Sequence, residues 1–519
     1  MDRNAPHPAA AAFAVSPACG NIAEYLSSPL ICEDTMSSAP TILLVHPLGY
    51  SARRAGHDIS RVANIMPPLG LASISAYLSA HGIDNDIIDC YAHPDSDSRI
   101  LAHVRDRRPH SIGFSCTTSS FFDGERLARL VKTVHPGIRT VFGGVHVSAL
   151  REEVLEQYPA VDYVVVGEGE ETLRQLLTTP PEDLARVEGL VFRDKGGRSV
   201  FTGRRRTLLD LDSLPLPAYT KLEGYPQAYT LPIFNYPTAP NGSCISSRGC
   251  PYACSYCDRS VFGRSFRYNS ADYLYRHMEF LRRTYGLRHL NFYDDQFTFN
   301  RQRVVDFCRM VKERPLGMTF NCAARAEHLD EELLHLMKEA GCWMISLGIE
   351  TGDAELLSAH RQNVDLVTMR ETILLIKKAG IRVKGLLMMG LPGETAASIK
   401  KSKEYVFSLP IDDFNLSKFT PFPGSPVYKQ IKEAGPLMGS FAEDWEKMDC
   451  MEFQFVPRGL EREQMERLFI DFYRSHFQRP RVMWGYVAML WRSPDSWRRF
   501  ISNLPSFLRF VTTNRRIAD

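Results

Sequence analysis

The sequence predicts two successive α/β domains and a helical C-terminal region. We expect the first domain to be doubly wound and Rossmann-like, and the second to be a partial (β/α)6 barrel of the TIM type. Short apolar runs typical of buried parallel strands alternate with amphipathic stretches. Glycines or polar residues follow most of these runs directly. The 519 residues provide enough chain for two or three separate cores.

The composition is that of an ordinary globular protein, with 44% hydrophobic and 24% charged residues. A formal net charge of +2 argues against nucleic acid as the main partner. Most of the 12 cysteines are spread along the chain, which suits a reducing cytoplasm better than a disulfide framework. We expect no signal peptide, and no run reaches the ~18 apolar residues of a membrane-spanning helix.

Residues 1–39 are rich in Ala, Pro and Ser without helical periodicity, and we expect a disordered tail. The first α/β domain is expected over residues 40–177. Its five predicted strands are 41–46, 84–89, 111–115, 140–142 and 163–166. Its two clearest predicted helices are 68–81 and 123–134.

Polar and glycine-rich segments follow three of these strands. Ligands bind outside the carboxyl ends of strands in such sheets, and glycines allow the backbone to approach a ligand closely. Each segment alone is a weak signal, because glycine after a strand is common. Together they predict a ligand site formed by Ser115, Thr117, Ser119, Gly143, Gly144, Gly167, Glu168 and Gly169.

Residues 178–242 are expected to link the two domains without catalytic residues. The segments 187–192 and 199–202 predict a small hairpin around Asp194–Gly197. Residues 209–219 form a connector interrupted by prolines.

The second domain is expected over residues 243–426, as six β/α units with the site at the carboxyl ends of the strands. The predicted strands are 243–247, 290–293, 318–322, 344–349, 383–389 and 414–419. The predicted helices are 271–285, 301–312, 331–340, 367–379 and 397–408. Cys308 and Cys342 are expected to be packing residues, whereas Cys322 could face the site.

Three cysteines follow the first strand of this domain with C-x3-C-x2-C spacing: Cys250, Cys254 and Cys257. Iron–sulfur clusters are held by cysteine thiolates and usually take four, so three ligands leave one iron open for a substrate or cofactor. A zinc site or a disulfide loop is the alternative. Zinc sites commonly show two C-x2-C pairs, and no second pair is present here.

With Tyr256 as the aromatic residue before the last cysteine, this motif resembles the signature of radical S-adenosylmethionine (SAM) enzymes. The resemblance implies a [4Fe-4S] cluster on the three cysteines, SAM at the open iron, and reductive cleavage to a 5′-deoxyadenosyl radical. It also implies an electron donor such as flavodoxin or ferredoxin.

The preceding domain, including Pro67–Leu71, resembles the cobalamin-binding domain of cobalamin-dependent radical SAM enzymes. The segment His46–Ser51 lacks the D-x-H-x-x-G motif, whose histidine ligates cobalt. The resemblance therefore implies cobalamin without a lower histidine ligand. His146 is an alternative ligand, although a loop histidine is more often a hydrogen-bonding residue.

The same resemblance implies cofactor-binding residues at the strand ends of the barrel. Asp294, Asp295 and Glu350 would lie near SAM, and Gly390 and Gly393 would shape its pocket. Arg325 could pair with a cofactor carboxylate or with a structural acid such as Glu350. The structural alternative is that these carboxylates cap helices or face solvent.

Residues 427–519 are expected to form a helical region with helices 461–477, 482–491 and 497–511. The last two mix aromatic residues with arginines, as in helices that lie on a membrane surface, although packed core is the more common explanation. This region resembles the C-terminal part of the anaerobic magnesium-protoporphyrin ester cyclase branch, which implies a hydrophobic small-molecule substrate and raises peripheral membrane contact as an option.

The leading functional hypothesis is methyl transfer to an unactivated carbon by a cobalamin-dependent radical SAM enzyme. Oxidative cyclisation or oxygen insertion on a tetrapyrrole or another hydrophobic substrate is the alternative reaction. A non-catalytic cobalamin or iron–sulfur sensor is the alternative of another class, and the intact cysteine motif argues against it.

Overall fold

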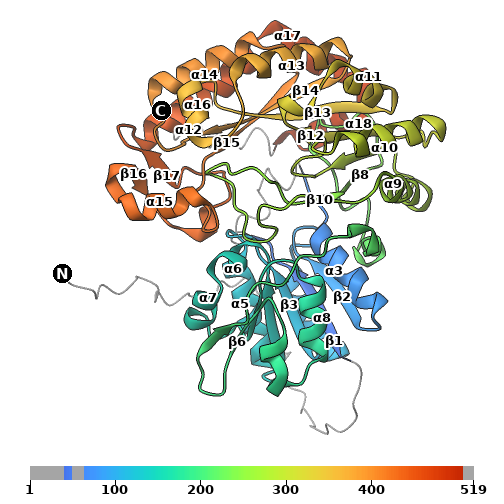
Figure 1. Cartoon of the computed structure of the whole chain (residues 1–519), viewed down its shortest axis with the longest axis vertical. Coiled ribbons are helices and arrows are strands. Elements are labelled where there is room, and N and C mark those ends of the chain that lie inside the picture. The colour runs from blue at the N-terminus through green and yellow to red at the C-terminus, as the bar shows by residue number, and fades with distance from the viewer. Residues whose placement is uncertain (1–39, 50–63, 506–519) are drawn as a thin grey trace. The chain divides into compact units, whose positions relative to one another are not determined.

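The computed structural model describes residues 40–49 and 64–505 (Figure 1). The expected disordered tail 1–39 and the end of the predicted helix 497–511 lie outside these residues. The described chain contains two large sheets, each with helices packed against it, followed by a helical C-terminal region.

The first sheet has seven strands in the order β2-β1-β3-β4-β5-β6-β7. Strands β1 to β5 are parallel, as their apolar runs predicted, and the strand order reverses between β1 and β3. Such a reversal creates the crevice in which doubly wound folds bind ligands. The strands are β1 (Thr41–His46), β2 (Asp84–Asp89), β3 (Ser111–Ser115), β4 (Arg139–Gly143), β5 (Tyr163–Val165), β6 (Leu190–Arg193) and β7 (Ser199–Phe201).

Helices cover both faces of this sheet. Alternate side chains of β1 separate into two cores, because successive residues of a strand point to opposite faces. Leu44 packs with α3 and α8, whereas Leu43 and Val45 pack with α4 and α5. The helices are α3 (Leu69–Ala80), α4 (Ser96–Arg107), α5 (Phe121–Val134), α6 (Val145–Leu150), α7 (Glu152–Gln157) and α8 (Glu170–Thr178).

The predicted hairpin is part of this first sheet. Strand β6 pairs antiparallel with β5, with Val164 opposite Val191, and β7 pairs with β6. The turn between them follows Asp194, whose backbone carbonyl accepts from Gly197 N. The segment expected as a linker therefore adds two strands to the edge of the sheet before the chain crosses to the second one.

The second sheet has six parallel strands in the order β15-β14-β13-β12-β11-β8. This sequential order with a helix after most strands is that of a partial barrel, which confirms the predicted fold class. The strands are β8 (Asn241–Cys244), β11 (His289–Phe292), β12 (Thr319–Ala324), β13 (Cys342–Glu350), β14 (Arg382–Met389) and β15 (Asp413–Lys418). The helices are α9 (Ala271–Tyr285), α10 (Arg301–Glu313), α11 (Glu331–Glu339), α12 (Ala354–His360), α13 (Leu366–Lys378) and α14 (Ala396–Ser408).

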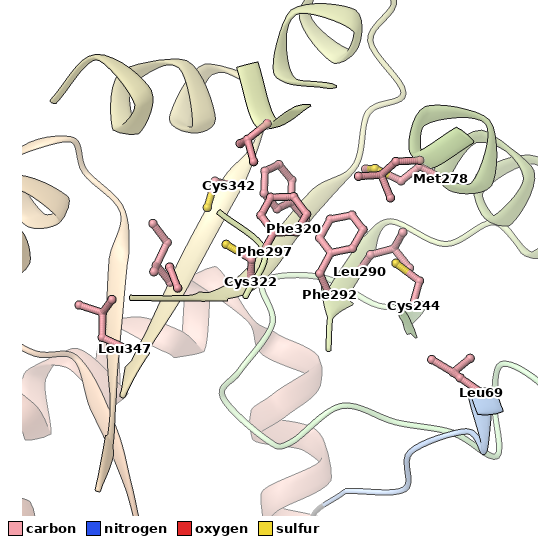
Figure 2. Close-up of a cluster of buried hydrophobic side chains, with 14 of the residues drawn as sticks. Leu69, Cys244, Met278, Leu290, Phe292, Phe297, Phe320, Cys322, Cys342 and Leu347 are labelled. Atoms are coloured by element: carbon pink, nitrogen blue, oxygen red, sulfur yellow. The ribbon is translucent and has the colours of Figure 1, made fainter. Parts of the chain in front are cut away.

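The core between these strands and helices is apolar and rich in aromatic rings (Figure 2). Phe292, Phe297 and Phe320 form its centre, with Phe292 and Phe297 stacked at 4.8 Å between ring centroids. Cys322 and Cys342 lie in the same cluster. The possibility that Cys322 faces the site is therefore wrong, because its side chain points to the helices, on the opposite face of the strand from the barrel interior.

The C-terminal region begins with α15 (Pro426–Ala434) and a short hairpin of β16 (Gly439–Phe441) and β17 (Phe455–Pro457). Three helices follow: α16 (Arg462–Phe477), α17 (Pro480–Arg492) and α18 (Pro494–Ser502). Helices α17 and α18 pack on the barrel through hydrogen bonds such as Tyr486 to Asp413 (3.0 Å) and Tyr236 to Asp495 (2.8 Å). None of the helices in the described chain has the length and apolar character needed to cross a membrane.

Candidate active site

The three cysteines lie in an irregular loop, residues 249–266, whose two ends are joined by a short ribbon. Strand β9 (Ser247–Arg248) pairs antiparallel with β10 (Arg267–Tyr268), with Arg248 opposite Arg267. Within the loop, Cys250 is half-buried, Cys254 is buried and Cys257 is exposed. The ribbon therefore closes the cysteine loop at its base.

Backbone contacts from two other segments hold the middle of this loop. Ser255 N donates to His360 O (3.0 Å), and Val427 N donates to Ser255 O (3.0 Å). The His360 ring lies between Ser255 Oγ and Pro392 O, 2.7 Å from each. His360 ends α12, a helix that the sequence analysis did not predict. The loop is thus positioned by contacts that do not involve its thiols.

The surroundings of the thiols favour a thiolate at Cys254. A hydrogen bond from Cys257 and the positive charges of Arg361 and Arg325 lower the pKa of Cys254 well below its usual range, although burial opposes this shift. The same hydrogen bond and burial raise the pKa of Cys257. Thiolates are the form of cysteine that binds metals.

The described residues contain no group of three or more His, Cys, Asp or Glu side chains that could hold a single metal ion. A multi-iron cluster takes one thiolate at each iron, so its ligands need not converge on one point. The donor set of three thiols on one loop, with a thiolate favoured at Cys254, fits such a cluster.

Glu350 lies at the carboxyl end of β13 in a left-handed backbone conformation, with φ of 62°. Its carboxylate pairs with Arg361 (3.1 Å), and burial raises its pKa. Tyr256 is packed nearby, and burial together with the Glu350 charge raises the pKa of its hydroxyl. Arg361 is the structural partner of Glu350 that the sequence analysis missed.

Arg325 is almost fully buried and is already paired within the chain. Its guanidinium carbon lies 3.7 Å from the centroid of the Tyr252 ring, and it binds the carboxylate of Glu327 and the carbonyl of Gln362. Of the two predicted roles, the contacts are those of a structural ion pair, with Glu327 rather than Glu350 as the acid.

The two adjacent aspartates after β11 have different surroundings. The carboxylate of Asp294 accepts from Ser246 N (2.6 Å) and Ser246 Oγ (2.5 Å), and it is buried beside Arg303. Asp294 therefore fixes the end of the first barrel strand instead of facing an open space. Asp295 lines the cavity described below, together with Tyr293.

Gly390 and Gly393 form the turn after β14, both with positive φ (105° and 86°). Gly390 N donates to the Glu394 carboxylate, which is fully buried. Burial raises the pKa of Glu394 to about 8, and the backbone donors of Gly390 and Leu391 limit the shift. The glycines are thus required by the backbone of this turn.

A cavity of about 360 Å³ lies at the carboxyl edge of the first sheet. Six of the eight residues predicted in the first domain line it: Ser115, Gly143, Gly144, Gly167, Glu168 and Gly169. Thr117 and Ser119 do not, and their hydroxyls lie 3.3 Å from each other. Arg248, Tyr293 and Asp295 are among the residues of the second domain that also line it, so one cavity is shared by residues of both domains.

The cavity wall suits a partly apolar cofactor. Leu44, Leu69 and Val141 supply apolar surface, and the glycines bring bare backbone to the edge. Gly144 has φ of 101°, and a Cβ there would lie 2.5 Å from Cys116 O, so this position accepts only glycine. The residues present fit the cobalamin that the sequence analysis expected.

His146 does not face this cavity. It is fully buried in α6, 4.8 Å from Phe121 and 4.4 Å from Trp445 between ring centroids, and its Nδ1 lies 3.3 Å from Thr118 Oγ1. Burial lowers its pKa to about 3, so the ring is neutral. The alternative that His146 ligates cobalt is therefore wrong, and the residue is part of an aromatic cluster.

Comparison with known families and proteins agrees with this geometry. Residues 58–177 match the B12 binding domain, and residues 244–406 match the radical SAM superfamily. An uncharacterised methyltransferase of Pyrococcus horikoshii is 28% identical over 85% of this chain and 93% of its own length. The anaerobic magnesium-protoporphyrin IX monomethyl ester cyclase of Rubrivivax gelatinosus is 26% identical over 84% of this chain and 77% of its own.

The fold is also similar to that of a solved structure, the cobalamin-dependent SAM radical enzyme OxsB with aqua-cobalamin and SAM bound. The TM-score is 0.68 at 16% identity, covering 91% of this chain and 75% of that one. At this identity the similarity concerns the fold.

Proposed function

Because the chain joins a B12-binding domain to a radical SAM domain and so belongs to the cobalamin-dependent radical SAM enzymes, we propose that it methylates an unactivated carbon of a small, apolar molecule. The observation that carries the proposal is the shared cavity, in which glycine loops of the first domain lie with Arg248 and Asp295 of the second. A cavity lined by residues of both domains is where a cofactor held by the first domain can meet a substrate held by the second.

In this proposal the cluster is held by Cys250, Cys254 and Cys257. SAM is bound near Asp295 and Glu350, whose carboxylates can accept from its amino and ribose groups. Gly390 and Gly393 shape the adjacent turn, and Ser115, Gly143, Gly144, Gly167 and Gly169 form the cradle for cobalamin. When bound, the cofactors supply the radical and the methyl group, while the protein positions them and excludes water.

Methyl transfer is preferred over ring closure because the P. horikoshii relative, which matches over most of its length, is named a methyltransferase. The R. gelatinosus cyclase supports the alternative reaction on a hydrophobic tetrapyrrole. Either reaction requires an external electron donor, for which we propose a flavodoxin or a ferredoxin.

The reaction type can be tested before the substrate is known. The protein is reconstituted anaerobically with iron, sulfide and hydroxocobalamin, reduced, and incubated with SAM. A methylase is expected to form 5′-deoxyadenosine and, in addition, S-adenosylhomocysteine in an amount that matches the bound cobalamin. Formation of 5′-deoxyadenosine without S-adenosylhomocysteine would favour the cyclase alternative.

Cys254→Ala is the matched control. It is expected to abolish 5′-deoxyadenosine, because removal of one thiolate prevents correct assembly of the cluster. If the wild-type protein forms no 5′-deoxyadenosine under these conditions, the enzyme proposal fails and a sensor role gains support.

We further propose that α17 contacts an anionic membrane surface. Met483, Trp484, Leu490 and Trp491 lie on one side of this helix, and the two tryptophans are 71% and 77% exposed. Arg481 and Arg492 are exposed beside them. Exposed tryptophans flanked by arginines are typical of helices that lie in a membrane interface.

The membrane proposal predicts sedimentation with vesicles of phosphatidylcholine and phosphatidylglycerol, weakened by salt and absent with phosphatidylcholine alone. Trp484→Ser with Trp491→Ser should reduce this binding at least tenfold. The control pair is Val367→Ser with Leu374→Ser, two exposed apolar residues of α13. An equal loss of vesicle binding in both pairs of variants, or no binding by the wild type, rejects the proposal. Self-association of the wild type in solution would indicate that the exposed apolar side of α17 binds a second copy of the chain instead.

A further inference from the structure

The base of the cysteine loop is tied to the glycine-rich loop of the first domain by two arginines and two glutamates. Arg248 Nη1 lies 2.5 Å from Glu168 Oε2, and Arg248 Nη2 lies 2.5 Å from Glu170 Oε1. Arg267 Nη2 lies 2.6 Å from Glu168 Oε1. Both oxygens of Glu168 are therefore engaged, one by each strand of the β9–β10 ribbon.

The four side chains are removed from solvent, with exposed fractions between 5% and 14%. Ser73 Oγ donates to Glu170 Oε1 (3.0 Å) and accepts from Arg248 (3.2 Å), while Arg267 Nη1 donates to Leu208 O (2.7 Å). Burial opposes ionisation of Glu170, but the charge and hydrogen bond of Arg248, together with hydrogen bonds from the Glu170 backbone and Ser73, lower the pKa of this carboxyl overall. Two positive and two negative charges thus compensate each other in a buried network.

The position of the network links two parts of the site. Arg248 is two residues before Cys250, and it lines the cavity together with Glu168 and Glu170. Glu170 begins α8, whose residue Leu173 also lines the cavity. A shift of the glycine-rich loop when the cavity fills would be transmitted to the cysteine loop through these ion pairs, because breaking one buried pair leaves an uncompensated charge.

We propose that Glu168 and Glu170 are positioning residues that couple occupancy of the first-domain cavity to the cysteine loop, and that Glu168 does not itself bind the cofactor. This inference rests on the proposed function only in assuming that cobalamin occupies the cavity and that SAM binds beside the cysteines. In this proposal the network couples the binding of cobalamin to the binding of SAM. By thermodynamic necessity, each ligand then changes the affinity for the other by the same factor.

The test measures SAM affinity instead of methyl transfer. Protein carrying the reduced cluster is titrated with SAM in the absence and presence of saturating hydroxocobalamin, and binding is followed by the electron paramagnetic resonance spectrum of the cluster. Cobalamin is expected to change the SAM dissociation constant of the wild type about fivefold or more. In Glu168→Gln and Glu170→Gln the change should fall below about twofold, measured on samples whose iron and cobalamin contents have been determined and matched to those of the wild type.

Glu171→Gln is the matched control, because this neighbouring residue of α8 pairs with Arg174 and Tyr77 and makes no contact with the network. It should retain the full coupling. Arg248→Lys should retain part of it, since an ammonium keeps the charge but cannot bridge two carboxylates as a guanidinium does.

Three results would overturn the inference: equal coupling in the wild type and both glutamine variants, loss of coupling in Glu171→Gln to the same extent, or absence of coupling in the wild type. If Glu168→Gln loses cobalamin while Glu170→Gln retains it, Glu168 itself binds the cofactor. None of these measurements depends on whether a methyl group is transferred, so failure here is distinct from failure of the proposed reaction.

Discussion

Glu350 combines two features that are costly in isolation. A non-glycine residue with positive φ is strained, and a buried carboxylate is poorly solvated. Arg361 offsets the second cost through a 3.1 Å contact, and it also binds the carbonyl of Gly348 on the same strand. Strained residues held by their surroundings cluster at functional sites, which supports our assignment of Glu350 to the SAM site.

Arg361→Met is expected to destabilise the protein by about 3 to 5 kcal/mol, because it leaves the Glu350 carboxylate buried without its partner. The urea dependence of unfolding measures this change. The double substitution Glu350→Gln with Arg361→Met should recover much of the loss, since both charges are then absent. If the free energy of unfolding of Arg361→Met falls by less than about 1 kcal/mol, solvent reaches the Glu350 carboxylate.

At the scale of single residues, the sequence predicted those site residues that lie close together along the chain or directly after a strand. The three cysteines are recognisable because they follow one another within eight positions, and the glycines are recognisable because each follows a strand. The partners Arg361 and Ser246 were not predicted. Arg361 follows a helix that was missed, and Ser246 contacts Asp294, which lies 48 positions further along the chain, only once the chain between them has folded.

At the scale of elements, the junction between β4 and α6 depends on one residue. Gly144 has φ of 101° and ψ of −177°, and both the nitrogen and the oxygen of Cys116 lie within 3 Å of where its Cβ would be. Since these neighbours are backbone atoms at the end of β3, they cannot move without displacing the strand.

Gly144→Ala is therefore expected to lower the free energy of unfolding by about 2 kcal/mol or more and to lower the cobalamin content at least tenfold. The content is measured by absorption after reconstitution and gel filtration. Gly137→Ala provides the comparison, because its nearest neighbour is the His135 side chain at 3.7 Å. Normal cobalamin loading of Gly144→Ala would show that this junction is not part of the cradle.

The strands of both sheets were predicted within a few residues because buried parallel strands are continuous apolar runs. Strand β6 was recognised, but its place in the sheet was not. The pairing of Val191 with Val164 is a contact between distant residues that leaves no mark on local periodicity. Helix α12 was missed because it has only seven residues, too few for a helical pattern to stand out.

At the scale of the whole molecule, the carboxyl ends of the parallel strands of both sheets contribute to one cavity. The sequence predicted each edge separately, since each is marked by glycines and carboxylates after strands. A cavity shared by both domains was expected, but that Arg248 and Asp295 would line it with Gly143 and Gly167 was not, because the choice of residues depends on how the two sheets pack. The ion pairs of Glu168 and Glu170 with arginines of the second domain were not predicted for the same reason.

The anchoring of the cysteine loop has a consequence for how the protein is assembled and maintained. Small zinc domains fold only when metal binds, because the metal supplies the interactions that close them. Here the β9–β10 ribbon and the backbone contacts of Ser255 supply interactions of the polypeptide itself that close the loop. We expect the chain to fold first and to receive its cluster afterwards from an assembly factor or from free iron and sulfide. If oxygen then destroyed the cluster, the chain would stay folded and could take up a new cluster.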